Sequence, residues 1–230
     1  MFEIKIKITT VSCCLIGNQT ESFSVGGVDQ STTTDEKGNP IIHGSAFKGA
    51  LRNLIREKYQ YKMEDTTGYI KSVIEKTLKK YENEDINKTE KINKIISNLK
   101  YKNENFKSEY IFGIEGVNGM PRLFCSDFRV SKCKNRKEDY FLIDTKNSLE
   151  EKDGNIFSNP RTYKVIKPGV EFEGIIRFYN PFSMEREDSS KEGLIKDELE
   201  KVLKEFNCGL YRIGNSKSRG YGQIKVEIID

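Results

Sequence analysis

The chain has 230 residues, of which 36% are hydrophobic and 32% are charged, and its formal net charge at pH 7 is +4. This length suits one large domain, or one domain with an insertion. The nearly balanced charge excludes a histone-like polycation, so any surface for nucleic acid must come from local sorting of charge.

The first predicted element is a strand over residues 2–11, in which apolar and polar residues alternate. Its apolar face holds Phe2, Ile4, Ile6 and Ile8. This alternation differs from the continuous apolar core of a signal peptide. Residues 17–40 follow as a polar, glycine-containing stretch that is too long for an ordinary connector, so we expect a functional loop there.

A helix is predicted to begin at His43-Gly44-Ser45, with Ser45 as its N-cap. Six apolar residues recur at helical spacing and should face the core: Ala46, Phe47, Ala50, Leu51, Leu54 and Ile55. Lys48, Arg52 and Arg56 form a basic stripe on the flank of that face. Such a stripe is usually a solvated helix flank, and it becomes evidence for a ligand only beside other signals.

Residues 66–108 are predicted to form a separate helical insertion, with two amphipathic faces joined by a polar linker over residues 81–91. Strand patterns then return at 110–112, 122–130 and 170–179, followed by a helix over 194–206 and a last strand over 223–229. The succession of β, α, β and then β, α, β elements fits an α+β sandwich of the ferredoxin-like type.

The loop over residues 214–222 is the strongest functional signal in the residues themselves. It contains three glycines, two serines, Lys217, Arg219 and Tyr221. Glycine lets the backbone approach a ligand closely, and successive N–H groups can form a concavity for an anion. Lys217 and Arg219 would add positive charge at the same place. We therefore expect a phosphate ligand, RNA in particular; the alternative is a glycine-rich turn with solvated charges.

The five cysteines are Cys13, Cys14, Cys125, Cys133 and Cys208, and no C-x-x-C pair occurs. An odd count without that spacing argues against a disulfide framework or a zinc site and favours a reducing cytosol. No apolar run approaches the length of a membrane span, so we expect a cytoplasmic protein with no membrane contact.

Four segments carry a resemblance to a known family. They are Gly26-Gly27-Val28-Asp29, the helix start at residues 40–52, Ile111-Phe112-Gly113 with residues 122–127, and Ser218-Arg219-Gly220-Tyr221-Gly222. In this order the chain resembles the RAMP superfamily of CRISPR effector subunits, and more narrowly the backbone subunit of type III complexes. The resemblance implies a ferredoxin-like (RRM-like) core over residues 1–65 and 109–230, a helical insertion over 66–108, and a thumb-like β-hairpin at about 144–164.

The resemblance also implies an activity, the cleavage of complementary target RNA at regular intervals. Asp29 stands where the family has its cleaving aspartate, and the family's cleavage needs a divalent metal, Mg²⁺ or Mn²⁺, which Asp29 would bind. A carboxylate can hold such an ion or accept the proton of a ribose 2′-hydroxyl. Asp35 is the competing carboxylate, and the structural alternative for Asp29 is an Asx-turn.

The RNA contacts that the resemblance implies fall on the first helix, the hairpin and the C-terminal loop: Lys48, Arg52, Ile156, Phe157, Arg161, Lys217, Ser218 and Arg219. The cations would hold phosphates, while base pairing between guide and target would read sequence. Ile156 and Phe157 would wedge between bases, with Arg161 beside them. The implied partners are guide RNA, target RNA, further copies of the chain in a filament, and other effector subunits.

Three alternatives stay open. The family often has a histidine just after its first strand, where this chain has Cys13 and Cys14. One alternative is therefore an RNA-binding scaffold in which Asp29 is inert. Another is a metal-independent, guide-processing endoribonuclease that uses His43, the only histidine, as its base. The third is a ferredoxin-like regulator or small-molecule binder, because fold alone does not establish function.

Overall fold

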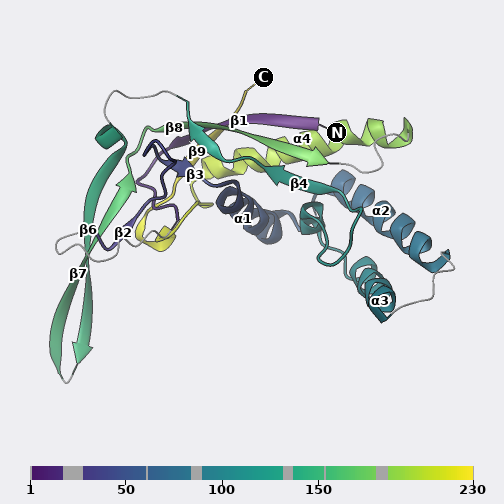
Figure 1. Cartoon of the computed structure of the whole chain (residues 1–230), viewed down its shortest axis with the longest axis horizontal. Coiled ribbons are helices and arrows are strands. Elements are labelled where there is room, and N and C mark those ends of the chain that lie inside the picture. Colours follow the sequence, from purple (N-terminus) through teal and green to yellow (C-terminus); the bar gives the residue numbers. More distant parts are fainter. Residues whose placement is uncertain are drawn as a thin grey trace. The chain divides into compact units, whose positions relative to one another are not determined.

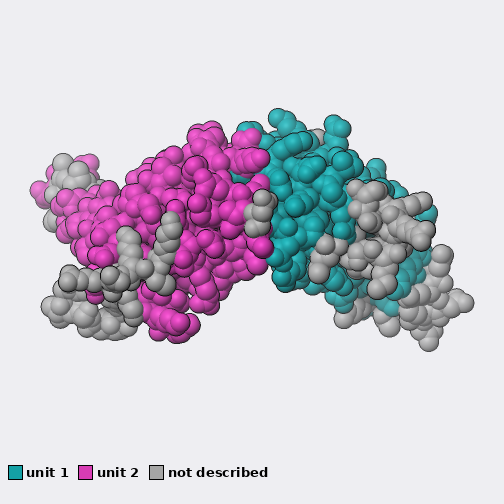
Figure 2. Space-filling view, turned by 90° about the horizontal axis from the view of Figure 1, so that it is seen from above, with its two compact units in different colours: residues 1–4, 51–125, 176–203 teal, residues 5–50, 126–175, 204–230 magenta. Residues whose placement is uncertain are grey.

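The computed structural model of the chain describes residues 2–17, 28–60, 62–83, 90–131, 137–152, 154–179 and 186–229. It shows the predicted α+β protein, built from antiparallel strand pairs and helices. The chain divides into two compact units, coloured separately in Figure 2. Unit 1 contains residues 1–4, 51–125 and 176–203, and unit 2 contains residues 5–50, 126–175 and 204–230.

The larger sheet has six strands (Figure 1). Its order is β3 (Ile41–Ile42), β5 (Phe128–Val130), β8 (Glu171–Tyr179), β1 (Phe2–Thr10) and β9 (Ile224–Ile229), with β4 (Arg122–Cys125) also paired to β8. The pairs β1–β9, β3–β5, β4–β8 and β5–β8 are antiparallel. Along the chain, β1, α1, β4 with β5, β8, α4 and β9 follow the β-α-β-β-α-β succession that the sequence predicts.

Four α-helices occur in the described residues: α1 (Gly44–Leu54), α2 (Glu64–Asn83), α3 (Glu90–Glu104) and α4 (Arg186–Lys204). The helices α2 and α3 fall in the segment where the helical insertion is predicted. A π-helical turn, η1 (Ile55–Tyr59), continues α1, and short 3₁₀ turns are η2 (Ser108–Phe112), η3 (Lys137–Tyr140), η4 (Glu205–Cys208) and η5 (Lys217–Arg219). Within the described ranges, no helix has the length and apolarity to cross a membrane.

Each unit has its own aromatic core. In unit 1, the Phe178 ring stacks on Phe2 at 5.1 Å between centroids and meets Tyr69 edge-on at 6.2 Å. In unit 2, the Phe47 ring lies 4.8 Å from Phe128 and 5.4 Å from Phe206. These rings come from α1, α2, β1, β5, β8 and η4, and all except the partly buried Phe2 are buried, so the helical and strand periodicities of the sequence describe the core correctly.

Two local predictions are wrong. The helix α1 begins at Gly44, so Ser45 lies inside its first turn, and the cap comes from Asp127, whose Oδ1 accepts the Gly44 N–H at 2.9 Å. Residues 110–112 belong to the 3₁₀ turn η2 and not to a strand. Three apolar residues are too few to distinguish a buried turn from a strand by periodicity.

The second sheet has the order β2 (Gln30–Ser31), β7 (Asn155–Ile166) and β6 (Phe141–Lys152). The strands β6 and β7 form a long antiparallel hairpin, from the pair Phe141–Ile166 to the pair Lys152–Asn155 (Figure 1). The short strand β2 pairs in parallel with β7, near the C-terminal end of β7. The hairpin covers the segment where the thumb-like hairpin is expected, and all three strands lie in unit 2.

Candidate nucleic-acid interface

The glycine-rich loop of residues 214–222 is fixed to the segment that follows β1. The backbone N–H of Asn215 donates to Leu15 O and that of Gly222 donates to Cys13 O, each at 2.8 Å. Gly214 and Gly222 have φ values of +74° and +80°. A Cβ at Gly214 would collide with Leu15 O, and one at Gly222 with Ile213 O. Glycine is therefore required at both positions by close backbone approach and by the left-handed conformation.

The tip of this loop presents the predicted cations to solvent. Lys217, Ser218 and Arg219 form the turn η5 and are all exposed. The turn lies between Ser216, with φ of +55°, and Gly220, with φ of +92°. The N–H of Arg219 donates to Ser216 O at 2.9 Å and that of Gly220 donates to Lys217 O at 3.1 Å, which closes the turn. The three polar side chains, together with the backbone N–H groups of Lys217 and Ser218, are therefore the groups that could receive an anion.

The loop packs on one face of the hairpin stem, the part of β6 and β7 next to β2. Tyr221 joins Leu15, Tyr163 and Val165 in one buried apolar cluster, with Leu142 against it. Asp144 pairs with Tyr163 and Lys146 pairs with Arg161, and paired residues of an antiparallel ladder share a face. Lys146 and Arg161 are therefore on the face that receives the loop.

Hydrogen bonds and a charge pair reinforce this packing. The Tyr221 hydroxyl donates a short hydrogen bond to Asp144 Oδ2, and Lys146 Nζ lies 3.2 Å from the same oxygen. Arg219 Nη1 lies 3.4 Å from the Tyr163 hydroxyl. Burial acts to raise the pKa of Asp144, but the Tyr221 hydrogen bond and Lys146 outweigh it, so this pKa lies below its usual value. Burial, followed by the contact with Asp144, raises the pKa of Tyr221. A protonated tyrosine and an ionised aspartate thus join the loop to the stem.

We call the four cations of this region, Lys146, Arg161, Lys217 and Arg219, the basic face. Three of them were predicted to contact RNA, and the structure brings Arg161 into the same region as the loop. Lys146 was missed, together with Tyr163 and Tyr221, which position the loop. Only the pairing register of β6 and β7 relates these residues to the loop, and that register cannot be derived from the sequence before the hairpin is known.

Asp29 lies immediately before β2 and is held to the stem by Thr162. Its backbone N–H donates to Thr162 O at 2.9 Å, and its Oδ2 accepts the Thr162 N–H at 2.6 Å and the Thr162 hydroxyl at 3.2 Å. The carboxylate is exposed, and its Oδ1 makes no hydrogen bond with any described residue. Side chains alternate along β7, so Thr162 points to the face opposite Tyr163 and the glycine-rich loop. Gly26 and Gly27, which precede Asp29, lie outside the described residues.

Asp35 has a different role. Its Oδ1 accepts the backbone N–H groups of Lys37 and Asn39, both at 2.9 Å, and its Oδ2 accepts the Asn39 amide at 3.3 Å. Arg129 Nη1 lies 3.8 Å from Oδ2. Burial acts to raise the pKa of Asp35, but these donors and the Arg129 charge lower it on balance. Both oxygens are therefore engaged in closing a turn.

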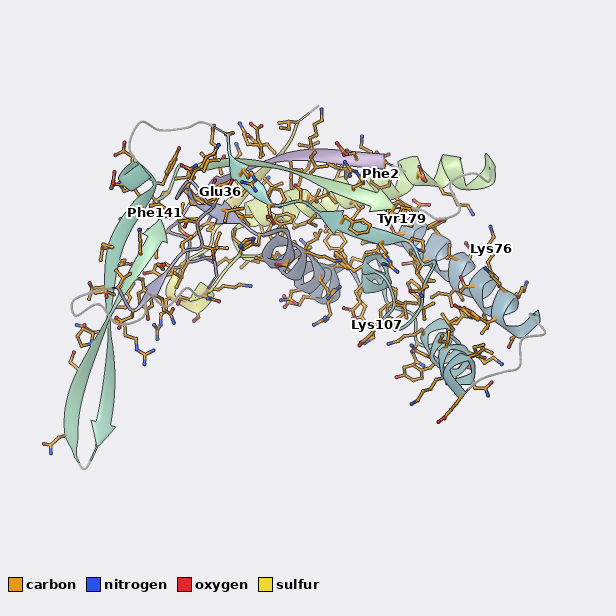
Figure 3. All side chains as sticks on the ribbon, in the orientation of Figure 1. Phe2, Glu36, Lys76, Lys107, Phe141 and Tyr179 are labelled. Carbon is orange, nitrogen blue, oxygen red and sulfur yellow. The ribbon has the colours of Figure 1, made fainter. Side chains whose placement is uncertain are left out.

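The opposite face of the stem, where Thr162 lies, also has a hollow of about 440 Å³. It is lined by Thr34, Gly38, Glu138, Phe141, Leu142, Ile143 and Lys164. Lys164 Nζ lies 5.0 Å from the centre of the Phe141 ring, which Figure 3 labels. Lys164 is two residues beyond Thr162 on β7. A hollow lined by apolar and charged residues, Glu138 and Lys164 among them, therefore lies on the same strand face as the residue that holds Asp29.

His43 is half-exposed at the start of α1. Its Nδ1 lies 3.5 Å from Asp127 Oδ1, the oxygen that also accepts the Gly44 N–H. The imidazole is therefore oriented by a carboxylate that is itself fixed to a helix start. A carboxylate that orients the imidazole in this way is a feature that supports a histidine acting as a base.

The two predicted cations of α1 lie in different units. Lys48 is partly buried in unit 2. Arg52 belongs to unit 1, where its guanidinium lies 4.9 Å from the centre of the Phe112 ring in a cation–π contact. Ile156 and Phe157 belong to β7 near the hairpin tip, but their side chains lie outside what the structure describes.

A protein-only metal cage is absent from the described part of the chain, where no three His, Cys, Asp or Glu side chains gather. Cys13, Cys14, Cys125 and Cys208 are not in disulfides, and Cys133 lies outside the described residues. Of the two aspartates in the predicted loop, Asp29 offers a carboxylate oxygen without a described hydrogen bond, whereas both oxygens of Asp35 are engaged. A single carboxylate oxygen suits an ion of the Mg²⁺ type. Such an ion keeps several water ligands and is usually bound by one or two carboxylates together with phosphate oxygens of the substrate.

Comparison with known proteins identifies the family. The profile of the RAMP superfamily matches residues 7–225, nearly the whole chain. The chain belongs to the RAMP superfamily. The family predicted from the four segments is thus confirmed at the level of the superfamily.

This RAMP protein also has the fold of a chain in a solved structure, the cryo-EM structure of the type III-B Cmr-beta bound to cognate target RNA. The two chains superpose with a TM-score of 0.59 at 18% sequence identity, over 99% of the RAMP protein and 60% of the other chain. The likeness at this identity is one of fold, and the protein spans well under two thirds of its neighbour's length. Among curated proteins, no relative matches the sequence.

Proposed function

We propose that this RAMP protein is the guide-RNA-binding backbone subunit of a type III CRISPR effector complex, and that it cleaves complementary target RNA at regular intervals. The observation that carries the proposal is membership of the RAMP superfamily over residues 7–225, combined with a glycine-rich loop seated on a basic hairpin stem. The neighbour in fold comes from a type III-B complex bound to target RNA. Its partners would be guide RNA, target RNA, further copies of itself and other effector subunits.

The architecture supports this role. The strand order β5 and β4, β8, β1, β9 is that of a ferredoxin-like unit, which we assign to residues 1–65 and 109–230. Residues 66–108 would be the helical insertion, and the β6–β7 hairpin would be the thumb. Ile156 and Phe157, near the end of the hairpin, are proposed as its wedge between bases.

Guide binding is assigned to the basic face. Lys217 and Arg219 would bind phosphates together with the N–H groups of η5 and the Ser218 hydroxyl. Lys146 and Arg161 extend the same charge along the stem, and Lys48 and Arg52 are proposed as further contacts. None of these groups reads bases, so the sequence of the target would be selected by pairing with the guide.

Cleavage is assigned to Asp29. Thr162 fixes one carboxylate oxygen with its N–H and hydroxyl, which leaves Oδ1 without a described hydrogen bond on an exposed side chain. Asp29 Oδ1 would hold a Mg²⁺ or Mn²⁺ ion, which, when bound, supplies positive charge that offsets the developing charge on the reacting phosphate. Asp29 can also accept the proton of the attacking 2′-hydroxyl. Because pairing with the guide positions the substrate, a single carboxylate is sufficient for slow cleavage.

The test is cleavage of target RNA by a reconstituted guide-bound complex in Mg²⁺. Asp29→Ala should slow cleavage by about 100-fold or more, as expected for loss of a general base, without changing target binding. Glu36→Ala is the matched control, because this side chain is 75% exposed in the same loop region and is labelled in Figure 3. Unchanged cutting by Asp29→Ala would reject the assignment.

A second experiment separates the alternatives. Cleavage that survives EDTA and is lost in His43→Ala would identify the metal-independent, guide-processing enzyme, for which the His43–Asp127 pair is the supporting observation. A wild-type complex that binds target and never cuts would identify the scaffold, in which Asp29 only closes the contact between β2 and β7.

A further inference from the structure

Two large aromatic side chains are exposed on the outer face of the larger sheet, in unit 1. Phe124 on β4 is 49% exposed and Tyr179 at the end of β8 is 45% exposed (Figure 3). Their strand neighbours Leu123 and Phe178 are fully buried. Because side chains alternate along a strand, Phe124 and Tyr179 lie on the face opposite the core.

The pairing of β4 with β8 places two arginines among these rings. Arg122 is opposite Tyr179, and Phe124 is opposite Arg177. Opposed residues share a face, with Cβ atoms roughly 4.5–5.5 Å apart. The four side chains form a two-by-two block in which each ring has a guanidinium group across the strand pair. We call Arg122, Phe124, Arg177 and Tyr179 the outer block.

The arginines of the outer block are held in position. Glu3 Oε2 accepts hydrogen bonds from Arg177 Nε at 3.0 Å and from Arg177 Nη2 at 2.6 Å, while the Arg177 side chain stays 52% exposed. The aliphatic stem of Arg122 runs beside Gly113. An exposed ion pair of this kind contributes little to stability, so its main effect is on the orientation of the guanidinium group.

In unit 2, lysines and glutamates of the same sheet are paired with one another. There Lys7 Nζ lies 2.9 Å from Glu227 and 3.9 Å from Glu171, and Lys225 Nζ lies 2.8 Å from Glu227. These charges neutralise one another, and the strand positions between them carry no exposed ring in the described residues. The outer block of unit 1 differs from this part of the sheet because its cations are arginines, one of them paired with Glu3, and because two exposed rings lie beside them.

We propose that the outer block is a stacking platform for two successive bases of a single-stranded RNA. Aromatic rings on the open face of a four-stranded α+β sheet are a known way to stack bases, and arginine planes stack in the same manner. The exposed guanidinium group of Arg122 beside the rings complements the phosphates of a nucleic acid, because arginine binds phosphate through its planar fork of N–H donors. This platform uses neither Asp29 nor the basic face. It therefore goes beyond the proposed function and shares with it only the class of ligand, RNA.

The chain contains no tryptophan, which makes a direct test simple. Phe124→Trp places a single indole in the outer block of the full chain. A 12-nucleotide, unstructured RNA is the probe, and Lys217→Glu with Arg219→Glu in the background removes the loop's contribution. We expect saturable quenching of the indole fluorescence. Leu210→Trp, at an 82% exposed position in unit 2, is the control and should not be quenched.

Variants of Tyr179 complete the test. Tyr179→Phe should keep the affinity measured by this quenching, whereas Tyr179→Leu should weaken it roughly five- to 100-fold, as expected for the loss of one base–aromatic stack. Melting temperatures of the variants report whether the fold is kept. Retained quenching in the loop-deficient background supports the platform even if the proposed guide binding fails.

The result that would overturn the proposal is an indole at position 124 that RNA does not quench. Equal affinities of Tyr179→Leu and Tyr179→Phe would also overturn it. A change in sedimentation of Tyr179→Leu, with RNA affinity unchanged, would show instead that the face binds a second copy of the chain, and would reject the RNA platform.

Discussion

At the scale of single residues, the two aspartates of the loop before α1, Asp29 and Asp35, differ in what they can bind. Asp35 uses both oxygens to bind backbone and side-chain donors of its own turn. Asp29 uses one oxygen on Thr162 and leaves the other without a described partner. A ligand can therefore be added at Asp29 without breaking the structure, whereas at Asp35 it would have to displace existing bonds.

This difference predicts opposite effects of substitution on stability. Asp35→Ala should lower the free energy of unfolding by about 1–3 kcal/mol, because it leaves the N–H groups of Lys37 and Asn39 without their acceptor. Asp29→Ala should lower it by less than about 1 kcal/mol, since the carboxylate is exposed. Denaturant unfolding of both variants measures the two values, and equal losses would contradict the distinction between the two roles.

Asp144 should give stability that depends on pH. Its pKa in the folded chain lies below the ordinary value of 3.8, so the folded state favours the ionised form. The stabilisation is fully present above the unfolded pKa and is lost as the pH falls through the lower folded pKa. We expect the difference in unfolding free energy between wild type and Asp144→Asn to be constant above about pH 5 and to shrink below pH 4. Denaturant unfolding from pH 7 to pH 2 measures it, and a difference that grows toward acid pH would contradict this account.

At the scale of elements, the regular core was predictable and the hairpin was not. The alternation in β1 and the helical spacing in α1 come from residues that must bury one face. In the β6–β7 hairpin the apolar residues gather at the stem and near the tip, whereas residues 144–148 and 158–162 are polar. No continuous alternation therefore predicts two long strands, and the hairpin was expected only from the resemblance to the family. Residues 110–112 were misread because a buried 3₁₀ turn and a short strand have the same apolar content.

In the candidate site, too, one part was predictable from the sequence and another part was not. Glycines and cations clustered in residues 214–222 are a local signal, so the loop was predicted from the sequence. The bond between Tyr221 and Asp144 joins residues 77 positions apart, and Thr162 is 133 positions from Asp29. Contacts at such separations are made by the topology of the chain, which neither composition nor spacing expresses.

The loop's role in RNA binding predicts a dependence on salt. Each cation that contacts a phosphate of single-stranded RNA contributes about 0.7 to the slope of log K against log salt concentration. Lys217→Ala and Arg219→Ala should each reduce the slope for guide RNA by about that amount and weaken binding at low salt. Lys225→Ala is the control, since this exposed lysine is paired with Glu227. Slopes that stay at the wild-type value in both loop variants would show that the loop does not contact phosphates.

At the scale of the whole molecule, the proposals assign three tasks to separate groups of described residues. The basic face would bind backbone phosphates on one side of the hairpin stem. Asp29 and the hollow lined by Phe141 and Lys164 are associated with the other side. The outer block of unit 1 offers aromatic rings for bases. This separation is what a subunit needs if it must hold one RNA strand continuously while acting on another.

The measurement that most directly tests the central claim is a map of the cuts in a labelled target RNA bound to the guide-loaded complex, in Mg²⁺ and in EDTA. The account predicts cuts at a constant interval in Mg²⁺ and an intact target in EDTA, with the target bound in both cases. A target that is bound but stays intact in Mg²⁺, or cuts that persist in EDTA, would contradict it.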